Sequence, residues 1–144
     1  LAIDPDDVYI NTMAGNCLFD LKRFPEALEH YFKVEFLAPD NKKILRPIAW
    51  CSFVSGKIEI ARSYMKNILE LEPTASDFIN AGHVELCLSS KPKAIDYYIK
   101  ALTQPGMNMV RFTRVISSDA PLLEANGVKA EEITLLLDYL RYLV

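Results

Sequence analysis

Prolines recur through this sequence at a nearly constant interval. Pro5, Pro39 and Pro73 are each separated by 34 residues, and Pro105 follows after 32. Proline just beyond a helix stops it, because proline cannot donate a backbone hydrogen bond and disfavours helical geometry in the residue before it. A fixed period of this length predicts an array of similar helical units.

Two further series of residues keep the same register. Small residues recur at two places in each unit, and a large side chain follows the second of them by four residues. The series are Gly15, Ala49 and Gly82; Ala27, Ala61 and Ala94; and Tyr31, Met65 and Tyr98. Antiparallel helices approach closely only where one offers a small side chain, and a bulky residue one turn further on fills the remaining space. The series therefore predict pairs of antiparallel helices.

These positions together resemble the tetratricopeptide repeat (TPR) family, whose consensus is W-x2-L-G-x2-Y, then A-x3-F, then P. The matched positions are Asn11, Ala14, Gly15, Leu18, Ala27, Tyr31 and Pro39; Leu45, Ile48, Ala49, Ser52, Ala61, Met65 and Pro73; and Phe78, Ala81, Gly82, Glu85, Ala94, Tyr98 and Pro105. Asn11, Ser52 and Glu85 depart from the consensus. The resemblance implies an all-α fold: an α-solenoid of antiparallel helix pairs that winds as a right-handed superhelix and ends in a C-terminal helical cap.

The resemblance also implies how the chain is divided. The expected segments are the end of a preceding repeat (1–6), three repeats (7–40, 41–74 and 75–106) and a C-terminal helical capping segment (107–144). Because the sequence begins inside a repeat, we expect a fragment of a longer array. Helices are expected at about 7–21, from 24, 41–55, 57–71, 75–88 and 92–102. Pro47 lies inside the third of these, so a late start or a kink is expected there.

The C-terminal segment loses the period but remains helical in pattern. We expect a helix over 107–116, a short turn over 120–126 that Asp119 caps, and a last helix over 129–144. The last helix is so apolar that it must be covered on more than one side. Either it caps the third repeat, or it contacts a second copy of the chain or another protein.

Composition excludes several classes of protein. The net charge of −3 and the pI near 5.4 argue against nucleic-acid binding, which normally uses a basic patch. No apolar run approaches the ~20 residues of a membrane span, and no secretory signal begins the sequence, so a cytoplasmic location is expected. The cysteines, Cys17, Cys51 and Cys87, lack metal-binding spacing and are expected to be free thiols.

The sequence contains no pattern that predicts catalysis. His30 and His83 have no companion at metal-ligand spacing, the five glycines form no phosphate-binding loop, and no nucleophile lies in a recognisable strand–turn–helix setting. We therefore expect a protein that is not an enzyme and that uses neither a metal nor a cofactor.

In arrays of this family the first helix of each repeat lines a concave groove, so a partner is expected to contact the residues that face away from the helix-pair core. They are Tyr9, Thr12, Asn16 and Phe19 in the first repeat; Arg46, Trp50 and Phe53 in the second; and Ile79, His83 and Leu86 in the third. Aromatic residues and arginine are enriched at binding hot spots.

This set of residues predicts a scaffold or chaperone-like adaptor that binds a peptide or helix of a partner protein in the groove. The alternative is an assembly or regulatory module that forms a homodimer through its apolar C-terminal helix.

Overall fold

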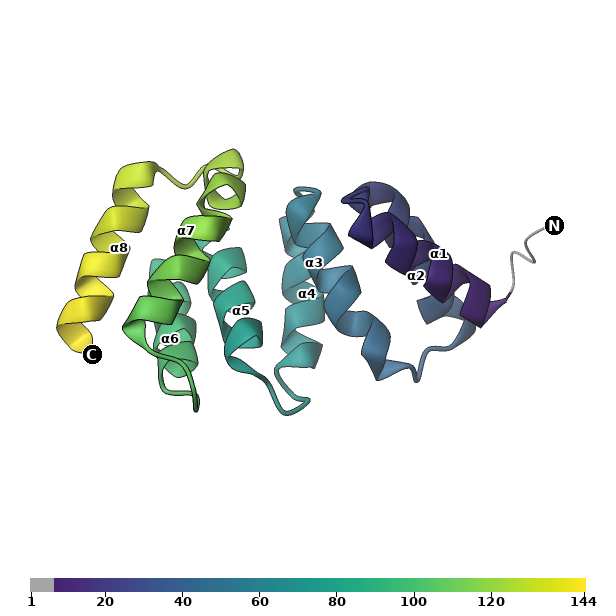
Figure 1. Ribbon diagram of the computed structural model, residues 1–144, viewed down its shortest axis with the longest axis horizontal. Coiled ribbons are helices and arrows are strands. Elements are labelled where there is room, and N and C mark those ends of the chain that lie inside the picture. Colours follow the sequence, from purple (N-terminus) through teal and green to yellow (C-terminus); the bar gives the residue numbers. More distant parts are fainter. Residues whose placement is uncertain (1–6) are drawn as a thin grey trace. The chain divides into compact units, whose positions relative to one another are not determined.

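The computed structural model describes residues 7–144, in which all regular structure is helical (Figure 1). The elements are α1 (Val8–Asp20), α2 (Phe24–Leu37), the 3₁₀ turn η1 (Lys42–Ile44), α3 (Leu45–Val54), α4 (Ile58–Ile68), α5 (Ala75–Cys87), α6 (Lys91–Leu102), α7 (Met109–Ala125) and α8 (Ala130–Leu143). The predicted all-α fold is confirmed. The segment expected to end a preceding repeat, 1–6, lies outside the described residues. The chain divides into two compact units, of which the first ends at Ile68 and the second begins at Leu69.

The first unit consists of the pairs α1–α2 and α3–α4, packed through α2 and α3. Asp7 caps α1, because its carboxylate accepts a hydrogen bond from the backbone N–H of Ile10 at 2.9 Å. A Cβ atom added at Gly15 would lie 2.9 Å from Cδ1 of Tyr31, so the glycine is required for the close approach of α1 and α2. The core of this unit is formed by Ala27, Leu28, Tyr31, Val34, Ile44, Ile48 and Cys51.

The third helix begins late, as Pro47 predicted. Asn41 accepts a hydrogen bond from the backbone N–H of Lys43, and η1 leads into α3 at Leu45. Pro47 therefore falls in the first turn of α3, where a backbone N–H would have no acceptor within the helix. The proline shortens this helix at its start without interrupting it.

In the second unit, α5 and α6 form a helix pair, α7 packs on α5, and α8 packs on α6 and α7. Thr74 and Asp77 form a reciprocal capping box at the start of α5. A Cβ atom at Gly82 would lie 2.7 Å from Cδ1 of Tyr98, which repeats the contact between Gly15 and Tyr31. The largest fully buried side chains here include Tyr98, Phe112, Ile116, Leu123 and Leu140.

The prediction of a break between residues 116 and 120 is wrong, because α7 is one continuous helix that contains Pro121. A residue other than proline at 121 would have donated its N–H to the carbonyl of Ser117, and both residues are exposed, so water can satisfy that carbonyl. Phe112 and Leu123 are buried on either side of the expected break. Burial of both ends on one face stabilises a single helix despite the proline.

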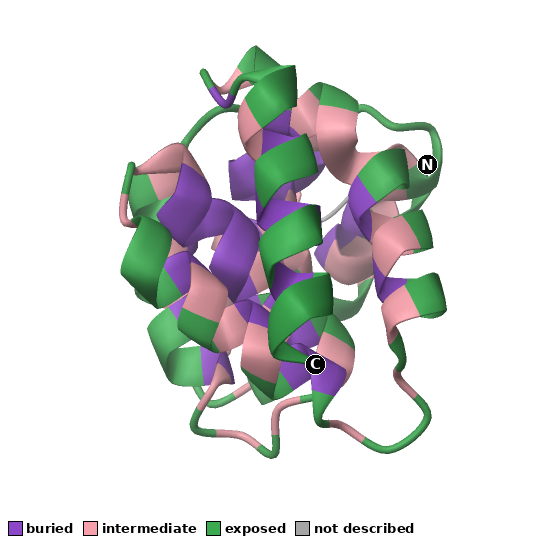
Figure 2. Cartoon of the chain, turned by 90° about the vertical axis from the view of Figure 1, so that its left-hand side faces the viewer, coloured by how far each residue is buried: buried purple, intermediate pink, exposed green. Residues whose placement is uncertain are grey.

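The last helix is covered on one side within the second unit. Figure 2 shows an exposed band along α8, the helix that ends at the C label. Ile133, Leu136 and Leu140 are buried, whereas Leu135 and Tyr142 are 68% and 87% exposed. Coverage on more than one side, as expected from composition, is not found within 69–144. In the described part of the chain, no helix is both long enough and apolar enough to span a bilayer.

Candidate functional site

The residues predicted to face a partner differ widely in exposure. Tyr9, Asn16 and Arg46 are exposed; Thr12, Phe19 and Trp50 are partly buried; Phe53, Ile79, His83 and Leu86 are buried. A buried side chain cannot contact a partner unless the fold rearranges. The candidate surface therefore lies in the first unit, on α1 and the exposed part of α3.

Three side chains form an exposed stripe along α1. Tyr9, Met13 and Asn16 are spaced by four and three residues, which places them on one face of the helix. Tyr9 is 71% exposed and Met13 is 47% exposed. Thr12 lies beside them, and its hydroxyl donates to the carbonyl of Val8 at 2.8 Å. These residues, Tyr9, Thr12, Met13 and Asn16, are called the α1 surface below.

At the end of this stripe, a pocket of about 330 Å³ opens between α1, α2 and α3. Its lining consists of Asn16, Phe19, Asp20, Tyr31 and Pro47, and it is called the α1–α3 pocket below. The Tyr31 hydroxyl donates a hydrogen bond to Oδ1 of Asn16 at 2.8 Å. Phe19 is held by an edge-to-face contact with Phe24, whose ring centroid lies 5.3 Å away. The pocket therefore has apolar walls, of which Phe19 is held in place by Phe24, and the side-chain amide of Asn16 is oriented by its hydrogen bond with Tyr31.

Asp20 is the only charged side chain among those that line this pocket. It is exposed, and within residues 7–144 its carboxylate forms no hydrogen bond or ion pair. Burial raises the pKa of Tyr31 to about 12, and the charges of Cys51 and Asp20 add smaller effects in the same direction. Asp20 is therefore the one negative charge among the side chains that line the pocket.

The equivalent position in the second unit is closed. His83 follows Gly82 as Asn16 follows Gly15, and its Nδ1 lies 2.8 Å from the Tyr98 hydroxyl. The other ring nitrogen, Nε2, lies 2.9 Å from Oδ2 of Asp119 on α7. His83 is 0% exposed, and the Tyr98 ring packs edge-on against Phe112, also on α7. The polar residue after the glycine is therefore buried beneath α7 in this unit, whereas Asn16 is exposed in the first unit.

Sequence reasoning missed the pairing of His83 with Asp119. The two residues are 36 positions apart, and Asp119 lies outside the repeats, where the expected break made it a helix cap. No local pattern in the sequence connects them. In the structure, Asp119 lies within α7, and its carboxylate joins that helix to α5.

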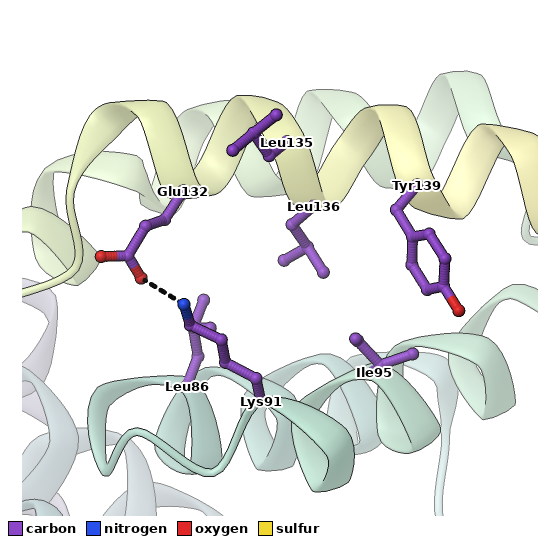
Figure 3. A pocket seen from close by; sticks show the side chains of 7 residues that line it. All are labelled: Leu86, Lys91, Ile95, Glu132, Leu135, Leu136 and Tyr139. Atoms are coloured by element: carbon purple, nitrogen blue, oxygen red, sulfur yellow. Dashed lines mark ion pairs between the residues drawn. The ribbon is translucent and has the colours of Figure 1, made fainter.

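A second pocket, of about 190 Å³, lies between α6 and α8 (Figure 3). Its lining is Leu86, Lys91, Ile95, Glu132, Leu135, Leu136 and Tyr139. Lys91 and Glu132 form an ion pair at 3.6 Å at one end of it. The side chains of Leu136 and Tyr139 point from α8 towards Ile95 on α6. Apart from the ion pair and the tyrosine hydroxyl, this α6–α8 pocket is apolar.

The cysteines are free, as predicted, and differ in environment. Cys17 is exposed on α1, whereas burial raises the pKa of Cys51 to about 12 and that of Cys87 to about 11. Within residues 7–144, no three or more histidine, cysteine or acidic side chains are grouped so that they could hold a metal ion.

Comparison with known proteins identifies the fold. No family model matches the sequence, and no curated protein matches it either. Among solved structures, the crystal structure of MamA, a TPR-like protein, is similar with a TM-score of 0.67 and 19% identity. The match covers 94% of this chain and 77% of the MamA chain. The chain therefore has a TPR-like helical-repeat fold.

Proposed function

We propose that the chain is a protein-binding module that holds a peptide or helix of a partner on the α1 surface and in the α1–α3 pocket. The observation that carries the proposal is an exposed stripe, Tyr9, Met13 and Asn16, that leads directly into a pocket. TPR-like folds typically serve as protein-binding scaffolds, which agrees with a binding function.

The residue types on this surface suit protein recognition. Tyr9 offers a large and rigid contact area with a polar end, and Met13 adapts its shape to different apolar partners. Trp50 lies three residues after Pro47 on α3, so the two residues lie on neighbouring parts of one helix face. A bound segment that reaches from Tyr9 to the α1–α3 pocket would pass near this indole and desolvate it.

A phage-displayed library of twelve-residue peptides, selected on the purified chain, tests the proposal. Peptides enriched by the selection should bind Tyr9→Ala more weakly by about 2 kcal/mol, the hot-spot threshold, or roughly thirtyfold. Binding should also shift the emission of Trp50, the single tryptophan, to the blue.

The matched control is Phe36→Ala, which removes an aromatic residue that is 85% exposed on α2 and belongs neither to the α1 surface nor to the lining of the α1–α3 pocket. This variant should bind the selected peptides as the wild type does. Equal binding by the wild type and Tyr9→Ala, or equal losses in Tyr9→Ala and Phe36→Ala, would contradict the proposal.

A second candidate function is self-association through α8. Leu135, Tyr139 and Tyr142 are 68%, 47% and 87% exposed, and they recur at spacings of four and three residues along one face. Light scattering over a concentration series should show a dimer that Leu135→Asp abolishes. Thr134→Asp adds the same charge at the neighbouring exposed position and should leave the dimer intact. A monomer at every concentration excludes this function.

A further inference from the structure

We propose that the α1–α3 pocket binds the cationic side chain of a lysine or arginine in the partner, with Asp20 as its counter-charge. This inference rests on the proposed function and adds the chemistry of the bound segment. Three features of the pocket support it: an unpaired carboxylate, the polarity of the helix end that carries it, and the apolar walls beside it.

Within residues 7–144, no basic side chain forms an ion pair with the Asp20 carboxylate that lines the pocket. Asp20 is the last residue of α1, and the last turn of this helix contains no basic residue. The C-terminal end of a helix carries a partial negative charge, so a carboxylate there is unfavourable and a cation is favoured. Arg46 precedes Pro47 in the sequence, but it does not line the pocket and has an interaction partner of its own. A cation from a partner would relieve this repulsion.

The shape and hydrogen-bonding groups of the pocket suit a long basic side chain. Lysine and arginine carry a charged head on an aliphatic stem, and Phe19 and Pro47 offer apolar walls for such a stem. Oδ1 of Asn16 accepts one hydrogen bond from Tyr31 and keeps a second lone pair for an incoming N–H donor. An acidic side chain would instead face the Asp20 carboxylate and be repelled.

The later repeats lack this carboxylate. The positions equivalent to Asp20, counted from Gly15, Ala49 and Gly82, hold Val54 and Cys87. In the second unit, the residue equivalent to Asn16 is His83, and it meets the carboxylate of Asp119 from α7. The chain therefore already uses this repeat position for a polar contact with a group from another helix. In the first unit, a carboxylate that could accept such a contact, Asp20, lies on the repeat itself.

Nuclear magnetic resonance titration with two small probes tests the inference. N-acetyl-arginine amide should shift the backbone amides of residues 16–21 in a saturable way, whereas N-acetyl-citrulline amide, which has a similar shape but no charge, should not. Asp20→Asn should weaken the arginine probe about two- to fivefold, the range expected for an exposed ion pair. Raised salt should reduce this difference. Asp40→Asn, which removes another exposed acid of the first unit, should titrate as the wild type does.

The inference is overturned if the citrulline probe gives the same shifts, if Asp20→Asn titrates as the wild type does, or if neither probe gives a saturable shift. These results are distinct from a failure of the proposed function. Selected peptides that bind Asp20→Asn normally but lose affinity for Tyr9→Ala would overturn the cationic pocket and sustain the α1 surface. Peptides that bind Tyr9→Ala normally would contradict the α1 surface.

Discussion

In the first unit, the polar residue that follows the glycine of the repeat, Asn16, is exposed beside a pocket, whereas in the second unit its equivalent, His83, is completely buried under α7. Both residues contact the hydroxyl of the tyrosine fifteen positions further along, Tyr31 or Tyr98, at 2.8 Å. The repeat thus fixes the pairing of residues within a helix pair. A neighbouring helix decides whether that pair faces solvent or belongs to a core.

A binding residue therefore cannot be assigned from its repeat position alone. In the second unit, Asp119 of α7 contacts His83; in the first unit, Ile48 and Cys51 of α3 pack in one core with Tyr31 but leave Asn16 exposed. The contact between His83 and Asp119 shows that the polar residue at this repeat position can bind a side chain from another helix. Substitutions at equivalent positions of the two units should therefore lower the stability of the protein by different amounts.

The largest difference should come from adding a methyl group at the two glycines. A Cβ at Gly82 lies 2.8 Å from Cζ of Tyr98, which is 0% exposed and enclosed by α7. We expect Gly82→Ala to destabilise the protein by about 3 kcal/mol, at the upper end of typical overpacking costs. At Gly15 the same distance is 3.1 Å, and the ring of Tyr31 borders a pocket into which it can shift.

Gly15→Ala should therefore cost less than Gly82→Ala, because the Tyr31 ring can shift towards the pocket. In both variants alanine gains about 1 kcal/mol of helix propensity, which offsets part of the strain. Urea unfolding followed by circular dichroism measures both variants. An equal loss in the two would contradict the expected difference, because both tyrosines are buried but only Tyr31 borders a pocket.

A smaller difference should follow from removing the polar partners. Asp119→Ala takes the carboxylate from Nε2 of His83, whose side chain is fully buried, and this should cost about 1–3 kcal/mol. Asn16→Ala removes the acceptor of the Tyr31 hydroxyl at a place that water can reach, so the cost should stay below about 1 kcal/mol. Urea unfolding again measures both, and a larger loss for Asn16→Ala would contradict the difference in burial.

The smallest effect should appear at alkaline pH. Burial raises the pKa of Tyr31 from 10.0 to about 12, and it also raises the pKa of Tyr98 well above its usual value. Each tyrosine therefore contributes stability that is fully present below pH 10 and is lost as the pH rises through its folded pKa. Urea midpoints between pH 9 and pH 11 should fall, with a shallower fall in Tyr31→Phe and Tyr98→Phe. An unchanged slope in both variants would contradict these pKa shifts.

Much of the fold could be predicted from sequence because the repeat is encoded in local spacing. The series that contain Gly15 and Tyr31, and Gly82 and Tyr98, predicted the helix pairs and their closest contacts. Pro47 correctly indicated a late start for α3. These signals depend on steric rules that act within a few residues or between adjacent helices.

The features that could not be predicted from sequence depend on contacts between residues that are far apart in the chain. Pro121 indicated a break, but burial of Phe112 and Leu123 on one face keeps α7 continuous. His83 was predicted to face a partner because nothing in its repeat indicates that α7 covers it. The α1–α3 pocket includes Pro47 from a second helix pair, so only part of its lining could be predicted from the periodicity.

The same repeat position is exposed at Asn16 in the first unit and buried at His83 in the second, and solvent access at the two residues can be measured directly. A neutral gadolinium chelate added to the ¹⁵N-labelled protein enhances the relaxation of protons that solvent can reach. We expect strong enhancement for the side-chain amide protons of Asn16 and almost none for the ring N–H of His83. Equal enhancement at the two positions, or a protected Asn16, would contradict the account.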